Sequence, residues 1–308
     1  MIKYIKIIIL LYFLISGKGF ALENNIILKI NNDIITSIDI FNEIKKIRFF
    51  NNNLAEIDNE EIYDIALQSL LRNRVKKIEV LKNVKSLEVQ NEDYLNLLIQ
   101  NAYKRLNIDN LVNFKKELSN RGINYEEFKN ELKVDIFWNE IIYSKFNNNV
   151  VIDEEKLKTQ LENTKKNNFE FNLSEIAYQV ENINEVEDEY KNIKNDIEKL
   201  GFENAALKHS LSNTASNGGN LGWVNEKAIN DEILNQIKSI PINSITKPIK
   251  IASGFVILKK NDQREFKNEF NFEEELKTLI NYERDQQLRN FSNLYFNKVK
   301  KNLKINAL

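Results

Sequence analysis

The stretch His209–Val224, HSLSNTASNGGNLGWV, decides the fold of this chain. It holds Gly218, Gly219 and Gly222, three of only eight glycines in 308 residues. Glycine costs conformational entropy in regular elements, and it persists where the backbone needs a positive φ or a close approach. Because a helical segment precedes the stretch and an apolar one follows it, we expect a turn leading into a short strand. That strand is expected to place Trp223 in a core.

Strand and helix signals alternate around this turn. The expected segments are strand 169–180, helices 184–200 and 202–208, strand 221–223, helix 229–240, and strands 248–251 and 254–260. The order β-α-α-β-α-β-β predicts an α+β domain of about one hundred residues, a common domain size.

The N-terminal half reads as a strand hairpin followed by amphipathic helices. Strand 26–30, turn 31–33 and strand 34–35 precede Thr36 and Asp39, which are spaced as a capping box at a helix start. Further helices are expected at 36–47, 60–81, 91–106, 111–120, 125–146 and 152–163. A long helix at 272–303 carries an apolar stripe and needs a partner, for which the N-terminal helices are the obvious candidate.

The first 21 residues predict a secretory signal peptide. Lys3 and Lys6 precede an unbroken apolar run at 7–15, and Ala21 ends a small-residue cleavage site. The alternative is a membrane anchor, but the apolar run is shorter than the ~20 residues that a spanning helix needs. We therefore expect export to the periplasm.

Composition excludes several classes of function. The chain has no cysteine and one histidine, His209, so disulfides, thiolate catalysis and histidine-rich metal sites are not expected. Its net charge of -1 argues against a nucleic-acid partner. The sequence also lacks a phosphate-binding loop of the Walker type. No cofactor, metal or nucleotide is therefore predicted.

Several motifs in matching order resemble the parvulin (PpiC-type rotamase) family of peptidyl-prolyl isomerases. They are LSEI at 173–176, HS at 209–210, GGNLGW at 218–223, SITKPI at 244–249 and GFVILK at 254–259. The stretches 31–39 and 121–128, together with the signal peptide and the helices, resemble the SurA-like family of periplasmic chaperones.

The resemblance implies an α+β protein with a helical N-terminal chaperone domain completed by a C-terminal helix. A single parvulin-like domain, an antiparallel sheet with surrounding helices, is added to it. The implied boundaries are signal peptide 1–21, chaperone domain 22–167, parvulin-like domain 168–265 and closing helix 266–308.

The implied isomerase site departs from the family at its polar positions. Rotation about an X-Pro bond faces a barrier of ~18–20 kcal/mol, and active parvulins resemble one another in using paired histidines beside an acid or thiol. Here Glu175 and Val256 stand at the histidine positions and Ser212 at the acid or thiol position. Ser212 and Glu175 are the candidate catalytic residues, and His209 is expected to be structural. The candidate substrate-binding residues are Ile229, Ile233, Phe255, Leu221 and Trp223.

The resemblance therefore implies a periplasmic chaperone whose isomerase activity is weak or lost. Its expected partners are unfolded outer-membrane proteins or other exported polypeptides, with the outer-membrane assembly machinery as a further candidate. An active peptidyl-prolyl isomerase is the alternative. An exported structural or adhesive protein without clients is a third hypothesis, although it would not need the ordered parvulin motifs.

Overall fold

Helices and two antiparallel sheets make up the fold. The computed structural model describes residues 24–51, 54, 57–89, 92–163, 169–265 and 271–308. The predicted signal peptide lies outside the described residues. Among the described helices, none combines the length and apolar character required to cross a membrane.

The first part of the chain forms a helical unit. It contains β1 (Ile26–Ile30), β2 (Asp33–Thr36), α2 (Ser37–Phe50), α3 (Asn59–Asn83), α4 (Glu92–Arg105), α5 (Leu111–Asn120) and α6 (Tyr125–Phe146). A 3-10 turn, η2 (Asn147–Asn149), and helix α7 (Glu154–Asn163) lead out of it.

The sheet unit follows. Its strands are β3 (Phe169–Tyr178), β4 (Asn220–Asn225), β5 (Ile249–Ile251) and β6 (Gly254–Glu265), and its helices are α8 (Val186–Leu200), α9 (Phe202–His209) and α10 (Asp231–Ser239). Short 3-10 turns are η3 (Ile183–Glu185), η4 (Asn213–Asn217) and η5 (Glu226–Ala228). The chain closes with α11 (Phe272–Lys301) and β7 (Ile305–Ala307).

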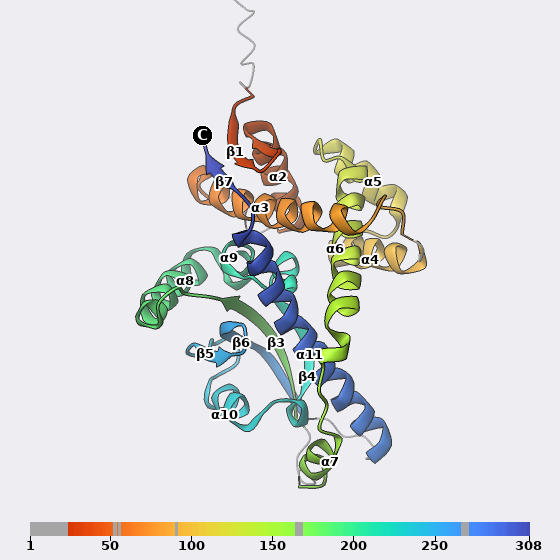
Figure 1. Ribbon diagram of the computed structural model, residues 1–308, viewed down its shortest axis with the longest axis vertical. Coiled ribbons are helices and arrows are strands. Elements are labelled where there is room, and N and C mark those ends of the chain that lie inside the picture. Colours follow the sequence, from red (N-terminus) through yellow and green to blue (C-terminus); the bar gives the residue numbers. More distant parts are fainter. Residues whose placement is uncertain (1–23, 52–53, 55–56, 90–91, 164–168, 266–270) are drawn as a thin grey trace, which may run out of the picture.

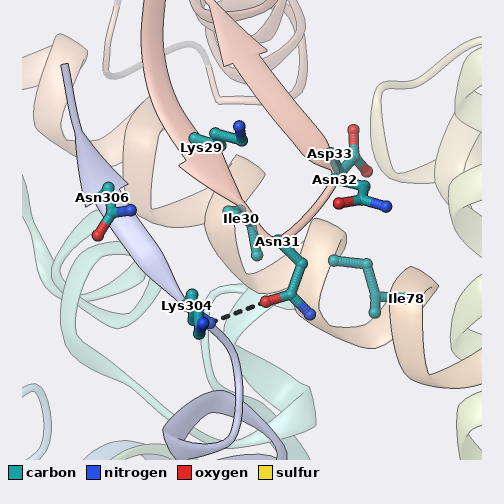
Figure 2. Close-up of a pocket in the computed structure, with 8 residues that line it drawn as sticks. All are labelled: Lys29, Ile30, Asn31, Asn32, Asp33, Ile78, Lys304 and Asn306. Carbon is teal, nitrogen blue, oxygen red and sulfur yellow. Dashed lines mark hydrogen bonds between the residues drawn. The ribbon is translucent and has the colours of Figure 1, made fainter.

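The N-terminal hairpin gains a third strand from the far end of the chain. The sheet order is β2-β1-β7, and both pairings are antiparallel. Asn31, at φ 51, donates its backbone N–H to the carbonyl of Lys304 at 2.9 Å, and its side-chain oxygen accepts from the Lys304 N–H at 2.9 Å (Figure 2). Strand β7 was not predicted, because three residues are too few to show a period. The hollow beside this turn, about 810 Å³, contains none of the predicted site residues.

The predicted capping box at the start of α2 is confirmed. The Thr36 hydroxyl accepts from the Asp39 N–H at 3.2 Å, and the Thr36 N–H donates to the Asp39 carboxylate at 2.8 Å. These two bonds satisfy backbone donors that a helix start leaves unpaired, which fixes where the hairpin ends and the helix begins.

Helix α11 packs into the helical unit, as predicted. Phe296 and Val299 of α11, and Leu303 just after it, belong to the same apolar core as residues of α2, α3 and α6. Trp138 of α6 is fully buried, and its indole N–H donates to the Ser292 hydroxyl of α11 at 2.9 Å. The expected α+β architecture, a helical unit completed by a C-terminal helix plus one antiparallel sheet unit, is therefore confirmed (Figure 1). The exact domain boundaries stay a prediction.

The sheet unit buries both faces of its sheet. The strand order is β4-β3-β6-β5, and all pairings are antiparallel. The apolar core on the first face, where α10 packs, contains Phe171, Leu173, Val224, Ile229, Ile233, Ile237, Ile249, Val256 and Leu258. The apolar core on the second face, where α8 and α9 pack, contains Ile176, Tyr178, Ile193, Phe202, Ala205, Ala206 and Ile257.

Arg72 of α3 joins the two units. Its guanidinium donates to the carbonyls of Leu207 at 3.0 Å and Ser210 at 2.8 Å, at the C-terminal end of α9. Helix ends leave such carbonyls without partners and favour a cation there. Burial lowers the pKa of Arg72 to about 10, although the Asp135 and Glu43 carboxylates act in the opposite direction. The side chain therefore remains charged at neutral pH.

Replacing this residue should weaken the attachment of the sheet unit. We expect Arg72→Met to lower the free energy of unfolding by about 2–4 kcal/mol, because two buried carbonyls lose their donor. Urea unfolding followed by tryptophan fluorescence measures the loss. The control is Arg74→Met on the same helix, whose ion pairs are longer, at 3.5 and 3.8 Å, and which should cost less than about 1 kcal/mol. Equal losses for the two variants would contradict this role of Arg72.

Candidate rotamase site and interdomain cleft

The two candidate catalytic residues lie together. Glu175 on β3 accepts hydrogen bonds through Oε1 from the Ser212 hydroxyl at 2.6 Å and from the Thr214 hydroxyl at 2.9 Å. Ser212 is almost fully buried at the start of η4, where its oxygen accepts from the Thr214 N–H. Thr214 was not predicted, although its position two residues after a helix-capping serine is a signal that could have found it.

This arrangement places hydroxyl groups around a carboxylate and brings no imidazole to it. His209 lies instead at the end of α9, where its Nε2 is 2.5 Å from the Asp196 carboxylate of α8 and its Nδ1 is 3.5 Å from Glu189. Burial acts to raise the pKa of Asp196, but hydrogen bonds from Lys208 and His209 outweigh it and lower that pKa. The histidine therefore joins two helices of the sheet unit.

Gly219 brings the glycine turn against the candidate catalytic strand. Its carbonyl accepts from the Glu175 N–H at 2.8 Å, and its φ is +76°. A β-carbon added to Gly219 would lie 2.2 Å from the Glu175 carbonyl oxygen, a distance that no packing tolerates. The predicted close approach of the backbone is therefore found at Gly219.

Alanine substitution separates close approach from backbone conformation. Gly219→Ala should destabilise the protein by about 3 kcal/mol or more, because both the clash and the positive φ must be relieved. Gly222→Ala is the matched control, since Gly222 has φ +73° but no heavy atom within 4 Å of an added β-carbon. That variant should cost about 1–2 kcal/mol. Denaturant unfolding midpoints compare the two, and equal shifts would argue against the contact with Glu175.

Three of the five candidate substrate-binding residues lie together on the first face of the sheet. Ile229 and Ile233 are buried in its apolar cluster, and Leu221 packs against that cluster. Val256, at the position of the second family histidine, is buried in the same cluster. This side of the sheet is apolar where active parvulins are expected to be polar.

The other two candidates lie elsewhere. Phe255 belongs to the second face, where its ring centroid is 5.8 Å from that of Tyr178. Trp223 is 37% exposed, with the Arg264 guanidinium 4.1 Å from its ring centroid. The prediction that Trp223 lies in the core is wrong, because side chains alternate along β4 and it is Val224 that points inward. The structure therefore does not assemble all five residues into one pocket.

A cleft of about 870 Å³ lies between the two units. Its helical wall presents the apolar residues Phe50, Leu98, Phe128, Leu132 and Ile136. Carboxamides of the sheet unit line the opposite side, at Asn172, Asn213, Asn220 and Asn261. The cleft was not predicted, because its walls come from separate parts of the chain, residues 43–139 on the helical side and 172–261 on the sheet side.

The floor of the cleft carries ion pairs. Lys46 lies between Glu43 at 2.5 Å and Glu131 at 2.6 Å, and Lys76 contacts Asp135 at 2.7 Å. Burial raises the pKa of Glu131 to about 7, and the neighbouring Glu43 carboxylate adds to the rise while Lys46 opposes it. Five basic and four acidic side chains line the cleft in all, so neither sign of charge dominates it.

Comparison with known proteins agrees with the motifs. Residues 159–262 match the Rotamase family, described as a PPIC-type PPIASE domain. The chain is 24% identical over 249 residues to the chaperone SurA of Pectobacterium atrosepticum, covering 76% of this chain and 56% of that protein. For SurA of Escherichia coli O157:H7 the identity is 23% over 247 residues, with 76% and 57% covered. The chain thus spans somewhat more than half the length of these curated relatives.

Two solved structures resemble this chain at low sequence identity. A SurA-like chaperone structure from Campylobacter jejuni is 17% identical, with 92% of this chain and 99% of that chain covered and a TM-score of 0.38. The peptidylprolyl isomerase PrsA of Bacillus anthracis is 21% identical, with 78% and 99% covered and a TM-score of 0.31. The resemblance predicted from the ordered motifs is confirmed by the family match and the curated relatives.

Proposed function

We propose that this chain, which is SurA-like and carries a PPIC-type rotamase domain, is a periplasmic chaperone for unfolded exported polypeptides. Outer-membrane proteins are the proposed main clients. The observation that carries the proposal is the cleft between the helical unit and the sheet unit, whose two walls differ in chemistry. The likeness to SurA chaperones over 76% of the chain supports it.

The two walls suit an extended client segment. Outer-membrane strands alternate apolar and polar side chains and are about ten residues long. Such a segment can turn its apolar side chains toward Phe50, Leu98 and Leu132, which pack against an apolar core built largely by α4, α5 and α6. Its backbone N–H and C=O groups can then pair with carboxamides of the opposite wall, since each carboxamide both donates and accepts. Binding through the backbone would be largely independent of client sequence.

The candidate rotamase site supports weak or lost isomerase activity. The Glu175 carboxylate accepts from two hydroxyls, Ser212 and Thr214. Those hydroxyls are thereby directed at the carboxylate and away from a substrate amide. The buried Val256 offers no polar group at the second histidine position. Nothing in this set of contacts favours the twisted amide of the transition state over the planar one, which is what catalysis requires.

An aggregation assay tests the chaperone proposal. The protein without residues 1–21, at several-fold molar excess over a urea-unfolded outer-membrane barrel, should suppress light scattering when the denaturant is diluted. Leu98→Glu should remove most of this effect, because a carboxylate in the apolar wall opposes the binding of apolar side chains. Val112→Glu is the control, since Val112 is 76% exposed outside the cleft. Scattering that proceeds unchanged with the wild-type protein would refute the chaperone function.

A protease-coupled assay on a Phe-Pro peptide tests the isomerase proposal. The rate constant with the same protein should stay close to the uncatalysed value, because the paired histidines are replaced. Glu175→Ala and Ser212→Ala should then change nothing. Robust turnover that disappears in either variant would instead establish the alternative, an active peptidyl-prolyl isomerase.

A further inference from the structure

Helix α11 crosses the first face of the sheet unit before it enters the helical unit. Figure 1 shows α11 passing beside β4 on its way to the helical unit, and its Tyr282 packs on the apolar cluster of this face. Its N-terminal half packs on α7 and on η5, with Leu276 and Leu279 beside Leu161 of α7 and Ala228 of η5. Because η5 leads directly to Ile229, this half of α11 lies next to the candidate substrate-binding residues.

Tyr282 of α11 reaches that apolar face. Its side chain packs against the cluster that contains Ile229, Ile233 and Val256. Both isoleucines are less than a tenth exposed. Burial raises the pKa of Tyr282, and the Glu175 carboxylate contributes to the rise, although Arg289 opposes it. The Tyr282 ring thus covers part of this apolar face.

Polar contacts hold α11 in this position along its length. Lys227 of η5, whose side chain is 1% exposed, pairs with Glu275 at 2.5 Å. The Ser253 hydroxyl is 3.2 Å from the side-chain oxygen of Asn290, and the Asn297 amide donates to Gln179 at 2.8 Å. A buried ion pair of this kind fixes position more than it adds stability. Contacts before and after Tyr282 along α11 thus hold its side chain against the cluster of Ile229, Ile233 and Val256.

We propose that Tyr282 covers the apolar cluster of Ile229, Ile233 and Val256, the candidate proline-binding surface of the rotamase domain, so that a client proline can reach it only when α11 moves away. The inference rests on the proposed function, since it concerns the regulation of the same domain. It supplies a second cause of weak isomerase activity that does not depend on the missing histidines. When only a small fraction of a protein is in the open form, its apparent affinity for a ligand is reduced by that fraction. Closure should therefore appear as weak peptide binding.

Binding of a fluorescein-labelled tetrapeptide with a central Phe-Pro bond, followed by polarisation, tests this proposal on the protein without residues 1–21. Tyr282→Ala should bind at least about fivefold more tightly than wild type, because the competing side chain is gone. Tyr282→Phe keeps the ring and should bind like wild type. The double variant Asn290→Ala with Asn297→Ala loosens α11 without touching Tyr282, and it should tighten binding in the same direction.

Two results would overturn the proposal. One is equal peptide affinity in wild type, Tyr282→Ala and the double variant. The other requires no variant: wild-type NMR that shows no nuclear Overhauser contact between the Tyr282 ring and the methyl groups of Ile229 or Ile233. The aggregation assay separates this failure from failure of the chaperone function, since suppression of scattering depends on the cleft and not on Tyr282. Tighter peptide binding without any suppression would leave closure established and the chaperone function refuted.

Discussion

The placement of the sheet unit on the helical unit depends on one buried cation. Arg72 satisfies carbonyls at the end of α9 from a helix of the other unit, so the C-terminal end of α9 depends on its neighbour for hydrogen-bond donors. Two apolar residues that flank this contact, Leu200 and Leu207, belong to the core of the helical unit. Because the contact fixes the distance between the units, it also fixes the cleft, whose lining includes Arg72 itself.

Much of the fold could be predicted from the sequence, because the features that indicate it are local. A glycine turn, ordered motifs and a capping box each involve neighbouring residues, and Gly219 and Thr36 act as predicted. The alternation of side chains along a strand also indicates that Phe255 and Trp223 point away from the first face, since their neighbours Val256 and Val224 point toward it. The prediction for these two residues relied on the resemblance to a family. The alternation of side chains along each strand is what decides which face of the sheet a residue occupies.

The remaining features could not be predicted, because they arise where distant segments meet. Tyr282 reads as one more apolar residue of a long helix until α11 is laid over the sheet. The pairing of Lys46 with Glu131 joins residues 85 positions apart, and no pattern in either helix indicates it. The contacts of Arg72 could not be predicted either. Its acceptors are backbone carbonyls, which every residue has, so the sequence does not indicate them.

The pairing of β1 with β7 has a consequence for the order in which this protein matures. Asn31 and Lys304 are 273 residues apart, yet they hydrogen-bond to each other. The first strand can therefore gain its second neighbour only after residues 305–307 have been synthesised. Contacts of such long sequence separation slow folding, since loop closure must precede them. A protein proposed to shelter unfinished chains thus passes through a prolonged unfinished state of its own.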